Sequence, residues 1–237
     1  MMPGIGLVWL ALLAAPEQGP SVEDGMLPAG AVGLSAAAGA RGLGGARPGA
    51  DLDLTLAIGI NDRLQINVLL PALVLRLGTP GATEILIGAG DWGLTYQDPP
   101  GLSYKQGAAL GVRTWYGRAL ALALTSDAGG TIGVLVASSP TFEFSGAAGV
   151  TWAATDAVSV HVALQVNRLP YEPSGNLWIS LGSAQRWGFR RVPLIAWRAR
   201  PNLSVDLYAA ATWPDPLTGS LTAQAMVGVT FWPADLK

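Results

Sequence analysis

His161 is the only histidine in the sequence and therefore its only conventional general base. It lies in the stretch HVALQVN, two residues after Ser159, and a histidine that activates a serine hydroxyl is a common pair for nucleophilic hydrolysis. Both residues fall on one side of an alternating segment, where same-side neighbours are about 6.6 Å apart at the backbone. Because that separation is awkward for a direct hydrogen bond, we predict a polar structural role for His161. Hydrolysis through His161 remains the alternative.

A second chemical motif, GAGDWG at 88–93, matches the glycine pattern of dinucleotide-binding loops. Such a loop must open a helix, whose N-terminus holds the pyrophosphate. The residues that follow, LTYQDPPG, alternate and then reach Pro99 and Pro100, so no helix can form there. We therefore expect no dinucleotide cofactor.

The counts of charged and metal-binding residues exclude further classes of site. The sequence has no cysteine and one histidine, which rules out disulfides and the usual zinc ligand sets. A calcium site built from carboxylates alone stays open, but we expect no metal and no cofactor. The net charge of −2 offers no basic surface for nucleic acid, which we do not expect as a partner.

Polar residues of both signs recur at alternate positions along the chain. They face one way if their segments are strands, because successive strand side chains point to opposite faces. Two interpretations stay open for this set: a polar passage for solutes, or a packed network in which the charges pair with one another. The set is Asp51, Asp53, Arg63, Gln65, Asn67, Arg76, Arg113, Glu143, His161, Gln165, Asn167, Asp206 and Gln224.

The elements that must position these residues are strands. In DLDLTLAIGINDRLQINVLL, at 51–70, leucine and isoleucine alternate with polar or small residues on both sides of an Asn-Asp turn. Similar segments follow one another almost to the end of the chain: 29–40, 51–60, 63–77, 83–96, 103–114, 118–126, 131–138, 142–154, 158–168, 176–186, 190–199, 203–213 and 220–232.

The number of strands needs one adjustment. The segments are odd in number, whereas single-chain bacterial barrels have even numbers of strands. The stretch 176–199 does not alternate cleanly in its middle, so it can be one long strand with a loop excursion. We predict about twelve strands, with ten to fourteen allowed. At Pro71 and near Asp91 the apolar residues change parity, and we interpret both switches as β-bulges.

Composition decides what the apolar face of these strands meets. Charged residues make up 13% of the chain and mean hydropathy is +0.38, yet no apolar run reaches the ~18 residues of a spanning helix. Most segments span about ten to thirteen residues, the length of tilted membrane strands rather than of soluble ones. Many tryptophans and tyrosines fall near segment ends, where membrane barrels carry interfacial aromatics. The apolar face is therefore predicted to meet lipid, and the polar face to line a lumen.

The chain divides into four predicted regions. Residues 1–15 contain a short apolar core typical of a signal peptide, although no lysine or arginine precedes it. Residues 16–28 are polar and form a predicted linker, 29–232 form the barrel, and 233–237 form a C-terminal tail.

Three stretches resemble the porin-like superfamily of bacterial outer-membrane β-barrels. GINDRLQINVLL and ATDAVSVHVALQV are similar to its strand–turn–strand units, and LTAQAMVGVTFW resembles its C-terminal assembly signal, although PADLK follows here. The resemblance implies export, insertion by the barrel-assembly machinery, contact with outer-membrane lipid, and a structural or transport role. We therefore expect an all-β, antiparallel up-and-down transmembrane barrel in the outer membrane, whose oligomeric state the sequence leaves open.

The expected function is passive passage or binding of small polar solutes, without chemistry. Two alternatives belong to other classes. One is an outer-membrane enzyme that modifies lipid through His161. The other is a secreted soluble β-barrel that binds an apolar ligand. The first predicts loss of activity on mutation of His161, and the second predicts a protein that is soluble without detergent.

Overall fold

A computed structural model describes residues 26–43, 49–69, 72–79, 82–97, 101–116, 119–133, 141–168, 177–183, 186–187, 190–215 and 220–231. The predicted leader at 1–15, residues 16–25 of the predicted linker and the tail at 233–237 lie outside these ranges. Within them, no helix is long and apolar enough to cross a membrane.

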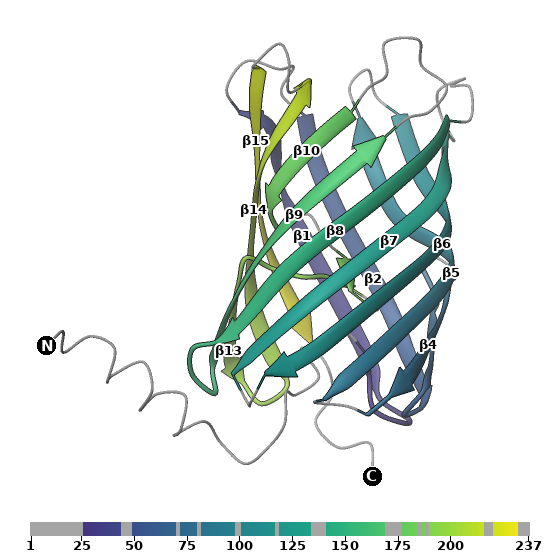
Figure 1. Cartoon of the computed structure of the whole chain (residues 1–237), viewed down its shortest axis with the longest axis vertical. Coiled ribbons are helices and arrows are strands. Elements are labelled where there is room, and N and C mark those ends of the chain that lie inside the picture. The colour runs from purple at the N-terminus through teal and green to yellow at the C-terminus, as the bar shows by residue number, and fades with distance from the viewer. Residues whose placement is uncertain are drawn as a thin grey trace, which may run out of the picture.

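The described strands form one closed antiparallel barrel with twelve positions around its wall (Figure 1). The first and last wall strands close the ring, with Leu34 paired to Phe231. The wall strands are β1 (Val32–Leu43), β2 (Gly49–Asn61), β3 (Leu64–Asn67), β4 (Ala72–Gly78), β5 (Thr83–Gln97), β6 (Gly101–Tyr116), β7 (Leu120–Gly133), β8 (Thr141–Ala153), β9 (Val158–Arg168), β10 (Leu177–Gly182), β13 (Ile195–Arg200), β14 (Leu203–Asp215) and β15 (Ser220–Phe231). A separate pair joins β11 (Arg186–Trp187) to β12 (Arg190–Arg191). The predicted all-β up-and-down barrel is confirmed.

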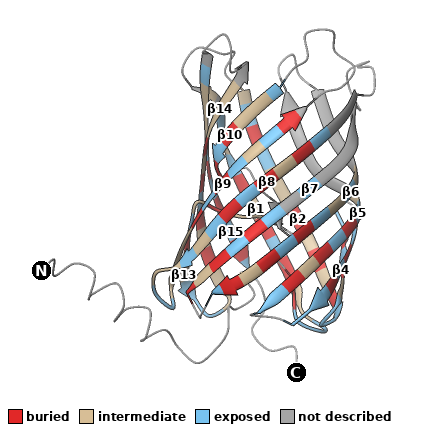
Figure 2. Cartoon of the chain, viewed as in Figure 1, coloured by how far each residue is buried: buried red, intermediate tan, exposed pale blue. Residues whose placement is uncertain are grey.

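Alternation along each strand separates two faces of the wall. In β4, Val74 and Arg76 are buried while Leu73, Leu75 and Leu77 are exposed. Figure 2 shows the same change from buried to exposed along neighbouring strands. The exposed face is leucine-, isoleucine- and valine-rich, which is the outer surface expected of a barrel in lipid.

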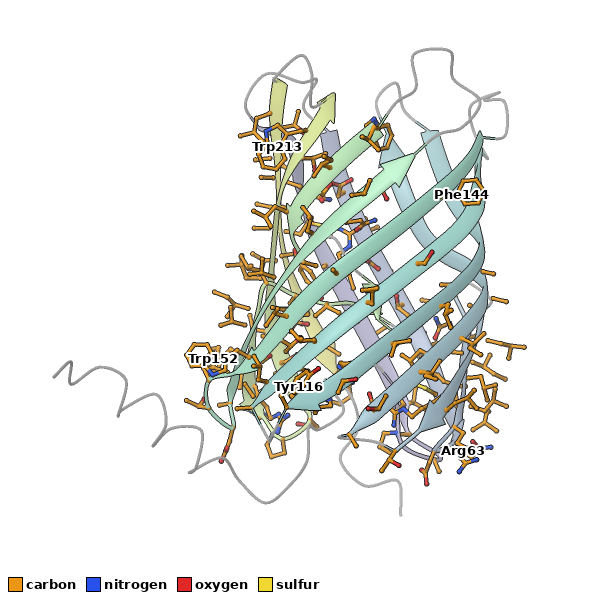
Figure 3. All side chains as sticks on the ribbon, viewed as in Figure 1. Arg63, Tyr116, Phe144, Trp152 and Trp213 are labelled. Atoms are coloured by element: carbon orange, nitrogen blue, oxygen red, sulfur yellow. The ribbon has the colours of Figure 1, made fainter. Side chains whose placement is uncertain are left out.

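Aromatic side chains mark the two ends of the wall. Tyr116 and Trp152 lie toward one end, whereas Phe144 and Trp213 lie toward the other (Figure 3). The first three of these side chains are exposed. Aromatic residues in such positions are typical of the two membrane–water interfaces.

The segment predicted as one strand at 63–77 consists of two strands. β3 and β4 form a hairpin in which Asn67 pairs with Ala72, so the chain reverses before Ala72. The predicted bulge at Pro71 is therefore wrong, because a reversal changes the inward parity just as a bulge does. The predicted bulge near Asp91 is confirmed by a shift in the β5–β6 register between Asp91 and Gly93.

In two places, a pair of segments predicted as separate strands occupies a single strand position in the wall. The segments 118–126 and 131–138 belong to the continuous strand β7 as far as Gly133, and residues 134–138 lie outside the described ranges. The stretch 176–199 is one interrupted strand: β10 and β13 both pair with β9 and with β14. These two mergers and the extra strand at 63–77 bring the predicted segments to the twelve positions observed.

Candidate functional site in the barrel lumen

The lumen is the candidate site because the inward face of the strands carries polar and charged side chains. Most of the residues that the sequence assigned to this face are buried there: Asp51, Gln65, Asn67, Arg76, Arg113, His161, Asn167 and Asp206. Three more, Asp53, Gln165 and Gln224, are partly buried at positions of the same parity. The structure therefore brings residues from β2, β3, β4, β6, β9, β14 and β15 to one enclosed space.

Arg63 departs from this set. It is exposed and lies in the turn between β2 and β3, where its backbone N–H donates to Asn61 Oδ1 at 2.8 Å. Figure 3 shows it at the end of the barrel. The strand alternation does not continue through the turn, which is why parity placed Arg63 in the lumen and the structure does not. The side chain of Glu143 lies outside the described part of the structure.

Asp206 is the centre of a buried network on β14, β15 and β1. Its carboxylate has no solvent exposure and accepts hydrogen bonds from Ser204 Oγ at 2.9 Å and Thr230 Oγ1 at 2.6 Å. The Tyr208 hydroxyl donates to the same carboxylate at 3.3 Å, and Ser35 Oγ lies 3.2 Å from Thr230 Oγ1. Hydroxyl donors are what a carboxylate removed from water requires. This network therefore joins the side chains of three adjacent wall strands.

A second group of polar contacts crosses from β15 to β2. Gln224 Nε2 donates to Asp51 Oδ2, and Thr55 Oγ1 lies 3.5 Å from Asp53 Oδ1. Asp53 Oδ2 also lies 3.8 Å from Nε of Arg191, a residue of β12. These aspartates therefore belong to a partly paired network.

A short ion pair in the lumen joins β5 to β6. Arg113 Nη2 lies 2.7 Å from Glu84 Oε2, with the two side chains 6% and 0% exposed. The Arg113 guanidinium also lies 5.3 Å from the centre of the Trp115 ring, within the range of a cation–π contact. The sequence analysis missed Glu84.

His161 is 2% exposed, and its Nδ1 lies 2.8 Å from Thr151 Oγ1 on the neighbouring strand β8. On the same strand Gln165 Nε2 donates to Asn167 Oδ1 at 2.8 Å. A histidine enclosed in this way is held by the wall and is poorly placed to receive a substrate. Within the described residues, no three histidine or acidic side chains gather into a metal-binding group.

The chain preceding β1 also lies against the inner face. Leu27 N–H donates to the side-chain oxygen of Gln65 at 2.9 Å, and Gly30 N–H donates to Gly59 O at 2.7 Å. Met26 packs with Val74 and Leu86, the inward residues of β4 and β5. The last residues of the predicted linker, 26–28, therefore sit inside one end of the barrel.

The sequence analysis also missed smaller and less polar inward residues. Besides Glu84, the inner face includes buried serines and threonines and a few apolar side chains: Ser35, Thr55, Ser145, Ser180, Ser204, Thr230, Val74, Leu86, Tyr208 and Met226. The signal that would have found them is parity. Most stand two or four residues from a polar residue that the analysis did assign inward.

This barrel architecture is also found among proteins of known structure. No protein-family model and no curated protein matches the sequence. Among solved structures, the NanC porin covers 84% of this chain and 98% of its own, at 10% identity and a TM-score of 0.50. The chain therefore shares its β-barrel fold with this porin. Two other solved barrels match with lower scores.

One is the KdgM porin, which covers 84% of this chain and 98% of its own, at 8% identity and a TM-score of 0.46. The other is the outer-membrane channel DcaP of Acinetobacter baumannii, with 88% and 100% coverage, 8% identity and a TM-score of 0.39. Identities this low concern the fold alone, so the function of this barrel has to be argued from its own residues.

Proposed function

We propose that the protein is a passive channel for small polar solutes in a bacterial outer membrane. The observation that carries the proposal is the opposite chemistry of the two faces of one wall. On β4, Arg76 is buried on the inner face while Leu75 and Leu77 are exposed on the outer face. A polar lumen with charges of both signs, enclosed by an apolar outer surface, is the arrangement found in outer-membrane barrels, including the channels of porins.

The outer surface argues against the soluble alternative. Leu124 is 61% exposed and Val227 is 60% exposed, and both belong to a wall covered with exposed apolar side chains. Soluble monomers rarely expose an apolar surface of this extent. The aromatic side chains at both ends of the wall, and the fold shared with the NanC porin, support the outer membrane as the location.

The enzyme alternative has less support. It needs His161 to reach a substrate, but this side chain is 2% exposed and hydrogen-bonded to Thr151. Polar groups buried within a wall are ordinarily satisfied by such contacts. We therefore assign His161 to the structure of the barrel.

Conductance of the purified protein in a planar lipid bilayer tests the proposal. The folded protein is identified by its faster migration on gels before boiling. We expect discrete current steps, and we expect liposomes containing the protein to admit small sugars and exclude large ones. The His161→Ala variant should conduct as the wild type does. Absence of both current and solute uptake with folded protein would overturn the proposal, and lipid hydrolysis lost in His161→Ala would favour the enzyme.

A further inference from the structure

The interrupted wall strand contains ten additional residues. Gly182 pairs with Ala163 of β9, and Ile195 pairs with Val160 of the same strand. Three steps along β9 therefore correspond to thirteen steps along the chain between Gly182 and Ile195. The pairings with β14 agree, because Gly182 faces Ala210 and Ile195 faces Leu207. A continuous strand would run directly from Ser183 to Leu194, so residues 184–193 are an insertion.

The wall remains hydrogen-bonded where the chain leaves it. Ser183 N–H donates to Ala209 O at 2.9 Å, and Ser183 Oγ accepts from Ala209 N–H at 2.8 Å, in the place of a strand carbonyl. Gly182 has a φ of +134°, and a Cβ there would overlap the Ala209 carbonyl oxygen. Where the chain returns, Leu194 O accepts from His161 N–H at 2.9 Å. The wall strands therefore stay hydrogen-bonded on both sides of the point where the insertion leaves and returns.

The returning limb, Arg190–Leu194, crosses the lumen. Arg191 Nε lies 3.8 Å from Asp53 Oδ2 on β2, and Arg191 Nη1 lies 3.7 Å from Met226 Sδ on β15. Val192 packs against the buried cluster of Met26, Val74 and Leu86, of which the last two belong to β4 and β5. Of these strands, β4 and β5 lie across the ring from β10 and β13, whereas β15 is separated from them only by β14 (Figure 1). We call residues 190–194 the crossbar.

The crossbar meets the far wall through Arg191 and Val192. The Arg191 and Asp53 side chains are 28% and 16% exposed, and Arg191 Nε lies 3.8 Å from Asp53 Oδ2. Val192 is only partly buried, whereas Ser183 and Gly182 at the start of the insertion are buried and tightly fitted. The arrangement places a charge pair and an apolar side chain inside the lumen, between the interrupted strand and the inward residues of β2, β4 and β5.

We propose that the crossbar is the element that restricts passage through the barrel, and that the Arg191–Asp53 pair holds it across the lumen. The proposal rests on the channel function proposed above and names the residues that limit flow. Pore diameter and the charges that line the narrowest part of a pore govern what it conducts. The crossbar, through Arg191 and Val192, supplies both.

Deletion of residues 184–193 tests the proposal and preserves the wall. Joining Ser183 to Leu194 keeps the pairings of both flanking segments with β9 and β14, so the barrel should fold and show the gel shift of the wild type. We expect single-channel conductance to rise roughly twofold or more, because the lumen loses its crossbar. The variants Arg191→Gln and Asp53→Asn break the pair within a full-length chain. Each single variant should raise the conductance or its fluctuations. The double variant should show little further increase over the single variants.

Arg200→Gln is the matched control, because Arg200 is exposed at the end of β13 and is not part of the crossbar. It should conduct as the wild type does. Should the wild type conduct and the deletion and Arg191→Gln give the same current steps, the crossbar proposal is overturned and the channel function stands. Should the folded wild type and deletion both be silent, the channel function fails and the crossbar proposal with it. A silent wild type and a conducting deletion would support the crossbar as a barrier and overturn free passage. Where the deletion does not fold, the two point variants decide.

Discussion

Arg113 and Glu84 form an almost fully enclosed ion pair inside the lumen, 2.7 Å apart across the β5–β6 ladder. The register makes them direct neighbours, and the Trp115 ring covers the guanidinium at 5.3 Å. The pair therefore joins two adjacent wall strands on the inner face, where a lone charge would be costly.

Replacing Glu84 with glutamine is expected to destabilise the barrel by about 3 kcal/mol, because it leaves a buried guanidinium without its carboxylate neighbour. The free energy of unfolding in urea, measured in lipid vesicles, gives the change. The Arg113→Met variant should lose a similar amount, and the double variant Glu84→Gln/Arg113→Met should lose less than the sum of the two.

Asp156→Asn serves as the control for this series, since Asp156 is exposed in the turn between β8 and β9. It should change stability by no more than about 0.5 kcal/mol. A loss in Glu84→Gln no larger than that of the control would show that the pair does not stabilise the wall.

Most of the fold was predictable because alternation is a strong signal. The strand expected at 158–168 is observed as Val158–Arg168. The errors come from places where period-two patterns are ambiguous. A bulge and a tight reversal both change which parity faces inward, so the residues around Pro71 could not distinguish them. In β7 the Gly129-Gly130 pair looks like a turn, but Gly129 pairs with both Gly107 and Glu143 inside the sheet.

The lumen was predictable as a face but not as a set of contacts. Glu84 was missed because Ile85, Leu86 and Ile87 follow it without alternation, so both faces of that segment are apolar in sequence. The partners of Arg113 and Asp206 depend on register between strands, which parity alone does not determine. The crossbar was foreseen only as a loop excursion within 176–199, because nothing local in that stretch shows on which side of the wall it runs.

The outer face supplies a test of the membrane environment. Val227 is 60% exposed in the middle part of β15. Val227→Arg is expected to cost about 2–4 kcal/mol of folding free energy in a bilayer, because a charge near the midplane is expensive. Unfolding in urea from lipid vesicles measures the loss. Phe231→Arg, at the end of the same strand, should cost no more than about 1 kcal/mol.

This pair of variants separates lipid from water at the outer face. In a soluble barrel, arginine at an exposed position such as Val227 would change stability by no more than about 0.5 kcal/mol. Equal and small losses at Val227 and Phe231 would therefore contradict the membrane-spanning barrel.

The hydroxyl network around Asp206 makes a further prediction. Thr230→Val keeps the shape of the side chain and removes the donor that lies 2.6 Å from the carboxylate. We expect a loss of about 1.5–3 kcal/mol in the free energy of unfolding, the range for hydrogen bonds to charged groups. Thr79→Val, in the exposed segment between β4 and β5, measures the effect of the substitution away from the lumen. Equal losses at the two positions would mean that Thr230 contributes nothing specific to Asp206.

The position of residues 26–28 on the inner face of the barrel depends on the absence of a side chain at Gly59. A Cβ there would overlap the carbonyl oxygen of Pro28, which is backbone and cannot turn aside. Gly59→Ala is therefore expected to displace residues 26–28 from the inner face while the barrel wall remains closed.

The natural chain has no cysteine, so a single cysteine at Leu27, a residue that is 1% exposed, reports the displacement. Leu27→Cys alone should react slowly with a charged, water-soluble thiol reagent, and Gly59→Ala/Leu27→Cys should react many times faster. Thr155→Cys, in an exposed turn, should react fast with or without Gly59→Ala. Equally slow labelling of the cysteine at position 27 with and without Gly59→Ala would contradict this prediction. It would show that residues 26–28 stay on the inner face by adjusting around the added methyl group.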